Sequence, residues 1–405
     1  MHHRQPRVIC LLTVVALASG SLFATTTTTP HKKKRRAHST TGTAASAKTT
    51  AAKTAQTRTV VAHHPVSHLS RLPKKRFINN PWTSPTFADS TVGDSVDGED
   101  LVVRRAAVQA LGPYNGTVVV VDPTNGRLLT IVNQKLAFQS GFQPCSTIKV
   151  VAALAGLNEG LIEQNTLLRV GRRRPMDLTE ALAHSNNAFF SAVGFKLGYD
   201  RIIHYAQLFG LGEKAGLDLE GEQAGTLASA PPSDGLGMMT SFGEGIYMTP
   251  LELAGLMMTV ANGGTLYYLQ HPKALDAPDQ FVPKVKRQID VQQWLPVIKP
   301  GMMGAVEYGT ARRANYNPDE PIFGKTGTCT DGRSPTHLGW FGSYNEVGGN
   351  KLVVVVLLTG GGKVNGPVAS GVAGAVYRNL SGSSYFTSTH GISPVALIST
   401  QSCCR

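Results

Sequence analysis

Three short polar motifs constrain this chain most, because a reaction that uses them together requires a fold that brings distant segments to one place. They are residues 146–149 (Ser-Thr-Ile-Lys), residues 185–187 (Ser-Asn-Asn) and residues 325–328 (Lys-Thr-Gly-Thr). Together they contain a hydroxyl nucleophile, an amine base, a second hydroxyl for proton relay, and a cation with hydroxyls that can anchor a carboxylate. Serine acyl transfer requires these groups.

The first motif is predicted to open a helix. Beyond Pro144, apolar residues recur at helical spacing, so Ser146 lies at the helix start and Lys149 lies one turn further along. Positions three residues apart share a helix face, which lets the amine reach the hydroxyl. The free N–H groups and the dipole at the helix start favour a developing oxyanion. Taken alone, the same pattern also fits an N-cap serine followed by a surface lysine.

The third motif is predicted to lie on the edge of a strand. Lys325, Thr326 and Thr328 would there present a cation and two hydroxyls to a substrate carboxylate. Gly327 would remove a side chain where the backbone of the ligand must approach. The plainer alternative is a loop with a solvent-exposed lysine.

The second motif carries a family resemblance. An Ala- and Leu-rich segment, residues 178–184, precedes it, and Phe189 and Phe190 follow it, which resembles the penicillin-binding transpeptidases. The resemblance covers roughly residues 110–380, and the motif set is closely similar to that of penicillin-binding proteins and class A β-lactamases. By this resemblance, Ser185 relays the proton and Asn187 hydrogen-bonds the acyl side chain of the substrate. Further matching segments are residues 208–212, 216–222, 241–251, 261–264, 308–311 and 337–342.

The resemblance implies an α/β (α+β) fold of the β-lactamase/transpeptidase type, with a central antiparallel sheet flanked by helices, a mostly helical lobe, and the site in the crevice between them. β-Branched runs at residues 116–122 and 127–133 flank an Asn-Gly turn and independently predict a hairpin.

The activity implied by the resemblance is that of a DD-transpeptidase, or a DD-carboxypeptidase, which acts on D-Ala-D-Ala stem peptides of peptidoglycan and is covalently inhibited by β-lactams. No metal or organic cofactor is implied. The implied catalytic residues are Ser146, Lys149 and Ser185, and the implied substrate-binding residues are Asn187, Lys325, Thr326, Gly327 and Thr328.

Two of the five cysteines flank these motifs: Cys145 precedes the nucleophile, and Cys329 follows the third motif. The implied fold places the two motifs side by side, and certain class A β-lactamases carry a disulfide at the equivalent places. We therefore predict a Cys145–Cys329 disulfide, which export would permit. The alternative is two small buried residues that stay reduced. The state of Cys403 and Cys404 is left open.

The net charge of +13 belongs to the N-terminal part of the chain. Residues 1–80 contain 14 of the 39 lysines and arginines and none of the 26 aspartates and glutamates, so the remainder is close to neutral. Such a basic tail has two interpretations, and one is contact with anionic wall polymers or a membrane surface. The other interpretation, which we favour, is a solvated linker. A nucleic-acid partner is not expected behind an export signal.

The domain organisation follows from these shifts in composition. Residues 1–24, basic and then apolar, predict a secretory signal peptide or an uncleaved membrane anchor, and both export the chain to a periplasmic or other extracytoplasmic location. Residues 25–100 predict a basic, Thr/Ala/Lys-rich disordered linker. Residues 101–385 form the predicted transpeptidase domain, and residues 386–405 form a C-terminal tail.

Two rival functions stay open. A serine β-lactamase needs fast deacylation, and the class A glutamate has no convincing counterpart, since Glu220 and Glu222 fall in a transpeptidase-like stretch. A carbamylated Lys149 would be another route to deacylation, and the Cys145/Cys329 pair leans towards lactamases. The other rival is a non-enzymatic penicillin sensor or wall-binding module, against which the intact set of motifs argues.

Overall fold

The computed structural model describes residues 82–169, 175–217, 219–271, 281–348 and 350–387. The predicted signal or anchor, the linker up to residue 81 and the tail from residue 388 lie outside the described residues. Within the described ranges, no helix is both long and apolar enough to cross a membrane.

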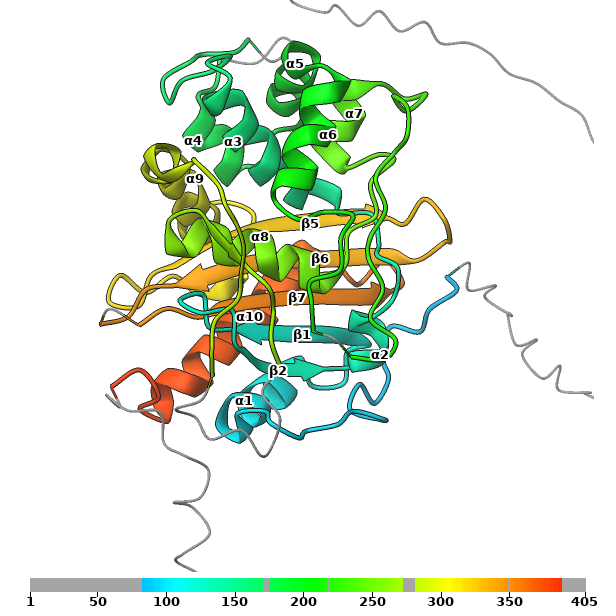
Figure 1. The fold of residues 1–405 in the computed structure, drawn as a ribbon, viewed down its shortest axis with the longest axis vertical. Helices are drawn as coiled ribbons and strands as arrows, with labels where there is room; N and C mark the ends of the chain where they lie inside the picture. Colours follow the sequence, from blue (N-terminus) through cyan, green and yellow to red (C-terminus); the bar gives the residue numbers. More distant parts are fainter. Residues whose placement is uncertain (1–81, 170–174, 218, 272–280, 349, 388–405) are drawn as a thin grey trace, which may run out of the picture. The chain divides into compact units, whose positions relative to one another are not determined.

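A five-stranded sheet organises the described residues (Figure 1). Its order is β2-β1-β7-β6-β5, and every neighbouring pair is antiparallel. The predicted hairpin is confirmed as the β1–β2 pair. The strands are β1 (Gly116–Val121), β2 (Leu128–Val132), β5 (Ile322–Thr330), β6 (His337–Asn345) and β7 (Val353–Gly360), and β3 (Thr265–Tyr267) pairs with β4 (Val285–Gln288) in a small second sheet.

The central strands are buried on both faces, which explains their continuous apolar sequences. Val119 of β1 and its partner Val355 of β7 belong to one hydrophobic core, whereas Val118 and Val356 belong to a second core. Since successive side chains in a strand point to opposite faces, the valine runs supply both cores at once.

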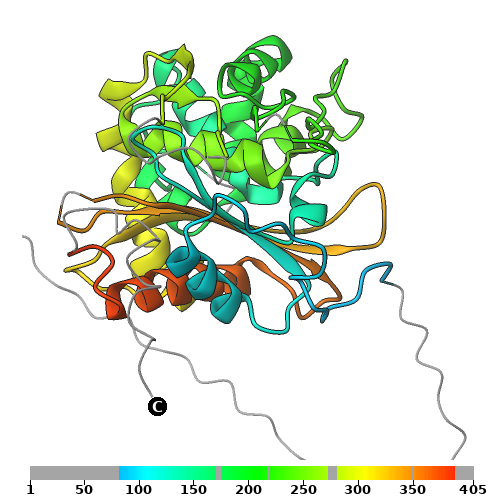
Figure 2. The same ribbon diagram turned by 60° about the horizontal axis from the view of Figure 1, so that its bottom comes forward.

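Helices cover both faces of this sheet (Figure 2). Helix α8 packs against one face of β1, β6 and β7, while α1 and α10 pack together on the other face. Helices α3 to α7 form a lobe beyond the β5 edge in Figure 1, so the predicted antiparallel sheet with flanking helices and a helical lobe is confirmed. The helices are α1 (Leu101–Leu111), α2 (Gln134–Ala137), α3 (Lys149–Asn158), α4 (Leu178–Ala183), α5 (Asn187–Leu197), α6 (Tyr199–Leu208), α7 (Leu236–Phe242), α8 (Pro250–Asn262), α9 (Leu295–Glu307) and α10 (Gly366–Gly382), with short 3₁₀ turns η1 (Cys145–Ile148), η3 (Gln292–Trp294) and η4 (Arg312–Ala314).

The structure corrects the predicted end of the linker. We expected a disordered linker as far as residue 100, but residues 82–100 pack on the domain. Phe87 forms an isolated antiparallel bridge with Tyr114, and the Thr83 hydroxyl lies 2.6 Å from that of Thr336. The composition of this stretch hid its role, because polar side chains supply many of its attachments, alongside ring contacts of Trp82 with His337 and of Phe87 with Tyr114.

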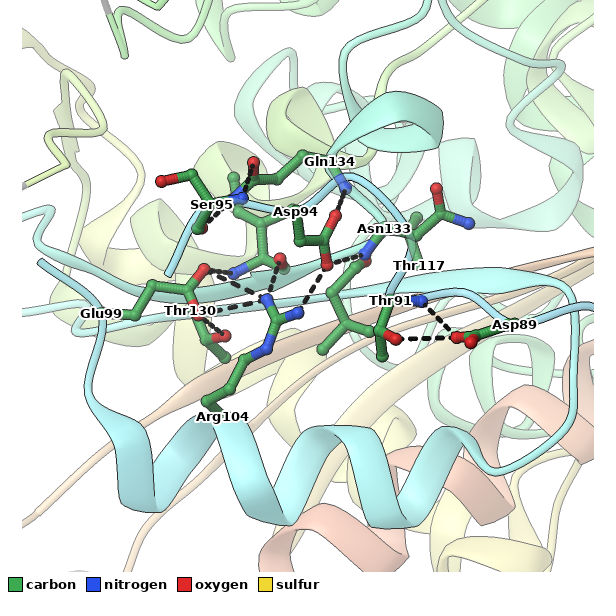
Figure 3. Close-up of polar contacts among 12 residues, drawn as sticks. Asp89, Thr91, Asp94, Ser95, Glu99, Arg104, Thr117, Thr130, Asn133 and Gln134 are labelled. Carbon is green, nitrogen blue, oxygen red and sulfur yellow. Dashed lines mark hydrogen bonds and ion pairs between the residues drawn. The ribbon is translucent and has the colours of Figure 1, made fainter. Parts of the chain in front are cut away.

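A buried ion-pair cluster also attaches this segment (Figure 3). Arg104 of α1 lies 2.6 Å from the Asp94 carboxylate and 3.2 Å from that of Glu99, and all three side chains are at most 10% exposed. The Glu99 carboxylate also accepts the backbone N–H of Ile131 at 2.9 Å, and Asp94 accepts that of Asn133 at 2.9 Å. The segment therefore covers the free edge of β2, which would otherwise expose unpaired backbone groups.

Candidate active site

Ser146 and Lys149 lie together as the i, i+3 spacing predicts. The Lys149 Nζ and Ser146 Oγ atoms are 2.7 Å apart. Ser146 lies in the 3₁₀ turn η1 rather than in the first turn of the α-helix, and α3 begins at Lys149. Cys145, just before the serine, has a φ of 50°, so the chain enters this turn through a left-handed residue. Ser146 is only 8% exposed.

Lys149 is held by the second motif as well as by the first. Its Nζ donates to Asn187 Oδ1 at 2.6 Å and to the carbonyl oxygen of Ser185 at 3.1 Å, and it lies 3.2 Å from Ser185 Oγ. The pKa of Lys149 is held well below its usual value, mainly by burial and to a smaller extent by repulsion from the Lys325 ammonium. A lysine in this state can accept a proton near neutral pH.

Ser185 lies in a tight turn between α4 and α5. Its φ of 54° places it in the left-handed region, and Asn186 caps α5 by accepting the Phe189 N–H at 2.9 Å. The Ser185 hydroxyl accepts from Lys325 Nζ at 2.8 Å and contacts Lys149 Nζ on its other side. The two amines are therefore connected through one hydroxyl.

Lys325 lies on β5, the edge strand of the sheet, as the third motif predicts. Its side chain is fully buried, and its Nζ donates to Ser185 Oγ and, at 3.0 Å, to the carbonyl oxygen of Thr326. Burial lowers the pKa of Lys325 to about 7.

The two threonines of the third motif line the pocket, whereas its glycine does not. The Thr326 hydroxyl lies 2.7 Å from that of Thr310, and the Thr328 hydroxyl accepts the Gly366 N–H at 2.8 Å. A Cβ on Gly327 would meet the Pro144 carbonyl oxygen at 2.9 Å. The missing side chain of Gly327 therefore makes room for the chain entering η1, and it does so on the strand face away from the threonines.

Cys145 and Cys329 are bonded in this structure. Their sulfur atoms are 2.00 Å apart and their Cα atoms 5.6 Å apart. Because Cys329 follows Thr328 and Cys145 precedes Ser146, the bond joins the first motif to the third.

A pocket of about 550 Å³ brings the three motifs together. Sequence reasoning missed several of the side chains around it. The neighbouring residues 308–311 had matched the transpeptidase pattern, but nothing in the sequence indicated that the two arginines after them reach the same pocket. Within the described residues, no cluster of His, Cys, Asp or Glu is arranged to hold a metal ion. The lining residues are Ser146, Ser185, Asn187, Phe242, Gly309, Thr310, Arg312, Arg313, Thr326, Thr328 and Pro367.

Comparison with known proteins identifies relatives of this chain. Residues 116–381 match the family model of the penicillin binding protein transpeptidase domain. The stage V sporulation protein D of Bacillus subtilis is 26% identical over an alignment of 313 residues, and the match covers 67% of this chain and 48% of that protein. The peptidoglycan D,D-transpeptidase MrdA of Haemophilus influenzae is 25% identical over 353 residues, covering 66% of this chain and 53% of MrdA. The chain thus spans about half the length of these curated relatives.

Solved structures show the same fold. The crystal structure of PBPA from Mycobacterium tuberculosis has a TM-score of 0.60 at 23% identity, covering 70% of this chain and 81% of that one. Because the family match extends over well more than half of the 405 residues, and the matching fold brings the three motifs to one pocket, the chain belongs to the penicillin binding protein transpeptidase domain family.

Proposed function

We propose that this chain is an exported serine acyltransferase that acts on D-Ala-D-Ala stem peptides of peptidoglycan, as a DD-transpeptidase or DD-carboxypeptidase, and that β-lactams acylate it. The observation that carries this proposal is the 2.7 Å contact between Ser146 Oγ and Lys149 Nζ beside a pocket built from all three motifs. The name of the relative MrdA, a peptidoglycan D,D-transpeptidase, supports peptidoglycan as the substrate. Export rests on the predicted signal or anchor, and wall or membrane contact rests on the basic tail.

Acylation begins with a proton transfer. Neutral Lys149 takes the hydroxyl proton of Ser146, whose oxygen attacks the carbonyl carbon of the penultimate D-Ala. The backbone N–H groups of Ser146 and Thr328 stabilise the oxyanion, and Asn187 binds the acyl side chain. The low pKa of Lys149 supports this role, because an amine that stays charged at neutral pH is no base.

The leaving group receives its proton through Ser185. Lys149 returns the proton to the Ser185 hydroxyl, which protonates the nitrogen of the departing D-Ala as the C–N bond breaks. The Ser185 hydroxyl is suited to this relay because it contacts both Lys149 and Lys325. The acyl-enzyme then transfers its acyl group to an amine, giving a cross-link, or to water.

A serine β-lactamase is the second candidate, and the bonded Cys145–Cys329 pair is the observation that favours it. Rapid hydrolysis requires activation of a water molecule. Of the described residues that line the pocket, none is an aspartate or glutamate. The Glu222 carboxylate instead accepts the Gly216 and Leu217 N–H groups, and Glu220 is exposed. These placements favour slow deacylation.

A time course with a chromogenic β-lactam, followed by intact-mass analysis, tests the proposal. A stoichiometric adduct on Ser146 that lasts many minutes with little turnover is expected. Rapid turnover without an accumulating adduct would support the β-lactamase, and no adduct would support a non-enzymatic binding module.

The matched control is Ser146→Ala, which should remove covalent labelling altogether. Labelling that persists in this variant would show that another group is the nucleophile. A D-Ala-D-Ala peptide offered with and without an amine acceptor would then separate transpeptidation from carboxypeptidation.

A further inference from the structure

Arg312 and Arg313 are two adjacent, exposed cations in the pocket that holds Ser146. Both lie in η4 and line the pocket, and neither guanidinium forms an ion pair with a described residue. With no carboxylate among the described lining residues, these charges are not neutralised by the pocket itself. An arginine fork with free donors is suited to binding a carboxylate through two hydrogen bonds.

Lys325, the cation that the third motif suggested for a substrate carboxylate, is already engaged elsewhere. Its side chain is fully buried, and its Nζ donates to Ser185 Oγ at 2.8 Å and to the Thr326 carbonyl oxygen at 3.0 Å. Because burial brings its pKa to about 7, its charge is also partial near neutral pH. A guanidinium stays protonated throughout this range.

The turn that carries the arginines is held by contacts with both α9 and α10. Ala311 N–H donates to the carbonyl oxygen of Ala305 in α9 at 2.7 Å, and the Ala314 carbonyl oxygen accepts from the side chain of Arg378 in α10 at 2.9 Å. A Cβ on Gly374 would lie 2.2 Å from that same Ala314 oxygen, so helix and turn are in direct contact. The arginine backbone is therefore placed by the core, while the two side chains reach outward.

Helix α10 also orients the Thr328 hydroxyl, which would donate to the same carboxylate as the arginines. Gly366, the first residue of α10, donates its N–H to the Thr328 hydroxyl at 2.8 Å. Thr328, Thr326 and both arginines line one pocket, so a ligand in it has two hydroxyls and two guanidinium side chains among its neighbouring residues.

We propose that Arg312 and Arg313 bind the C-terminal carboxylate of the acyl donor, and the corresponding carboxylate of a β-lactam, together with the Thr326 and Thr328 hydroxyls. Lys325 is then not the charge partner of the substrate. It hydrogen-bonds to Ser185, whose hydroxyl also contacts Lys149. This inference rests on the proposed function and names the residues that select an anionic donor.

Two probes that differ only in this carboxylate test the inference: benzylpenicillin and its neutral methyl ester. Intact-mass time courses give the second-order acylation rate constant of Ser146 for each probe, in the parent and in Arg312→Gln, Arg313→Gln and the double variant. Charge-assisted hydrogen bonds to a carboxylate predict a roughly 10- to 100-fold slower reaction of the double variant with benzylpenicillin. Its reaction with the ester should change less than about twofold, within the range of a surface substitution.

Arg105→Gln is the matched control, because Arg105 is an exposed arginine on α1 and the change removes the same charge. It should leave both rate constants unchanged. The double Arg312→Lys/Arg313→Lys variant, which keeps the charge without the fork, should recover part of the preference for the carboxylate.

Equal slowing of both probes would overturn the inference, since the arginines would then only support the pocket. Unchanged reaction with benzylpenicillin would overturn it as well. Absence of any adduct on Ser146 of the parent with either probe is a different result: it would overturn the proposed function itself, and the inference with it.

Discussion

Burial of the Lys325 ammonium should lower the free energy of unfolding, because a charged amine is better solvated in the unfolded chain. Its pKa is about 7 in the folded chain and near the ordinary 10.5 when unfolded, so between these values the unfolded state binds more protons. The free energy of unfolding should therefore rise as the pH increases from about 7 towards 10.5, and the burial penalty is largest at low pH.

Lys325→Met should remove this penalty. We expect the variant to be more stable than the parent at neutral pH by a few kcal/mol at most, since one pKa unit corresponds to about 1.4 kcal/mol. Acylation of Ser146 should be lost, because Ser185 loses its contact with the ammonium. Urea unfolding at pH values from below 7 up to about 10.5 measures the effect. The exposed Lys196 offers the control Lys196→Met, which should keep the full pH dependence of the parent. Lys325→Met should keep only the part of that dependence that the lowered pKa of Lys149 contributes; a dependence as large as that of the parent would contradict the assignment.

Gly309 illustrates how one missing side chain positions the second motif. A Cβ there would lie 2.2 Å from the Ala183 carbonyl oxygen and 2.8 Å from Ala305 Cα, both backbone atoms that cannot rotate away. Gly309→Ala should cost about 1–3 kcal/mol of stability, as overpacking commonly does. It should also slow acylation, because Ala183 lies two residues before Ser185.

Gly382→Ala is the comparison for that substitution. Gly382 ends α10, and nothing lies within 4 Å of its added Cβ. Helix propensity predicts a neutral effect or a gain of up to about 1 kcal/mol. Thermal unfolding of the two variants side by side measures the difference, and equal Tm values would show that the contact at Gly309 relaxes without cost.

Among the elements, α1 and β2 depend on the buried Arg104 cluster. Arg104→Ala would leave the Asp94 and Glu99 carboxylates buried without their cation, since these side chains are 2% and 0% exposed. Breaking a buried pair in this way typically costs about 3–5 kcal/mol. The adjacent Arg105 is exposed, so Arg105→Ala should stay within about 0.5 kcal/mol of the parent.

Denaturant unfolding of these two neighbours checks the prediction. Proteolysis at residues 82–100 should accelerate in Arg104→Ala alone, because that segment loses its attachment to the edge of β2. A similar small loss of stability in both variants would mean that the cluster contributes no more than a surface ion pair.

For the whole molecule, the Cys145–Cys329 bond joins residues that are 184 positions apart. The chain-entropy treatment of so long a loop gives a stabilisation of at most about 5 kcal/mol. Reduction should therefore lower the Tm, and it should slow acylation because the bond lies beside the backbone of both Ser146 and Thr328.

Comparison of oxidised and reduced protein, with thiols counted by mass after alkylation, measures both effects. The Cys145→Ala/Cys329→Ala variant should resemble the reduced parent and should not respond to reductant. A fully reduced parent with unchanged Tm and acylation rate would show that packing alone holds the two motifs together.

Local patterns predicted much of the fold correctly. The Asn-Gly turn between two β-branched runs identified the β1–β2 hairpin, and the three-residue spacing of Ser146 and Lys149 predicted their contact. The predictions were wrong where local propensity alone does not determine the conformation of a segment. Ser146 lies in a 3₁₀ turn, and residues 82–100 are attached by buried polar groups whose partners lie far along the chain.

The candidate reactive groups and the family could be predicted from the three motifs and their spacing, because these are local patterns that can be recognised without coordinates. The neighbours of those groups became visible only in the folded chain. The tertiary structure placed Lys325 beneath the pocket and Arg312 and Arg313 in it, and it assigned Gly327 to the packing of η1. The physical reason is that burial and charge pairing depend on contacts between distant segments, and spacing along the chain does not encode them.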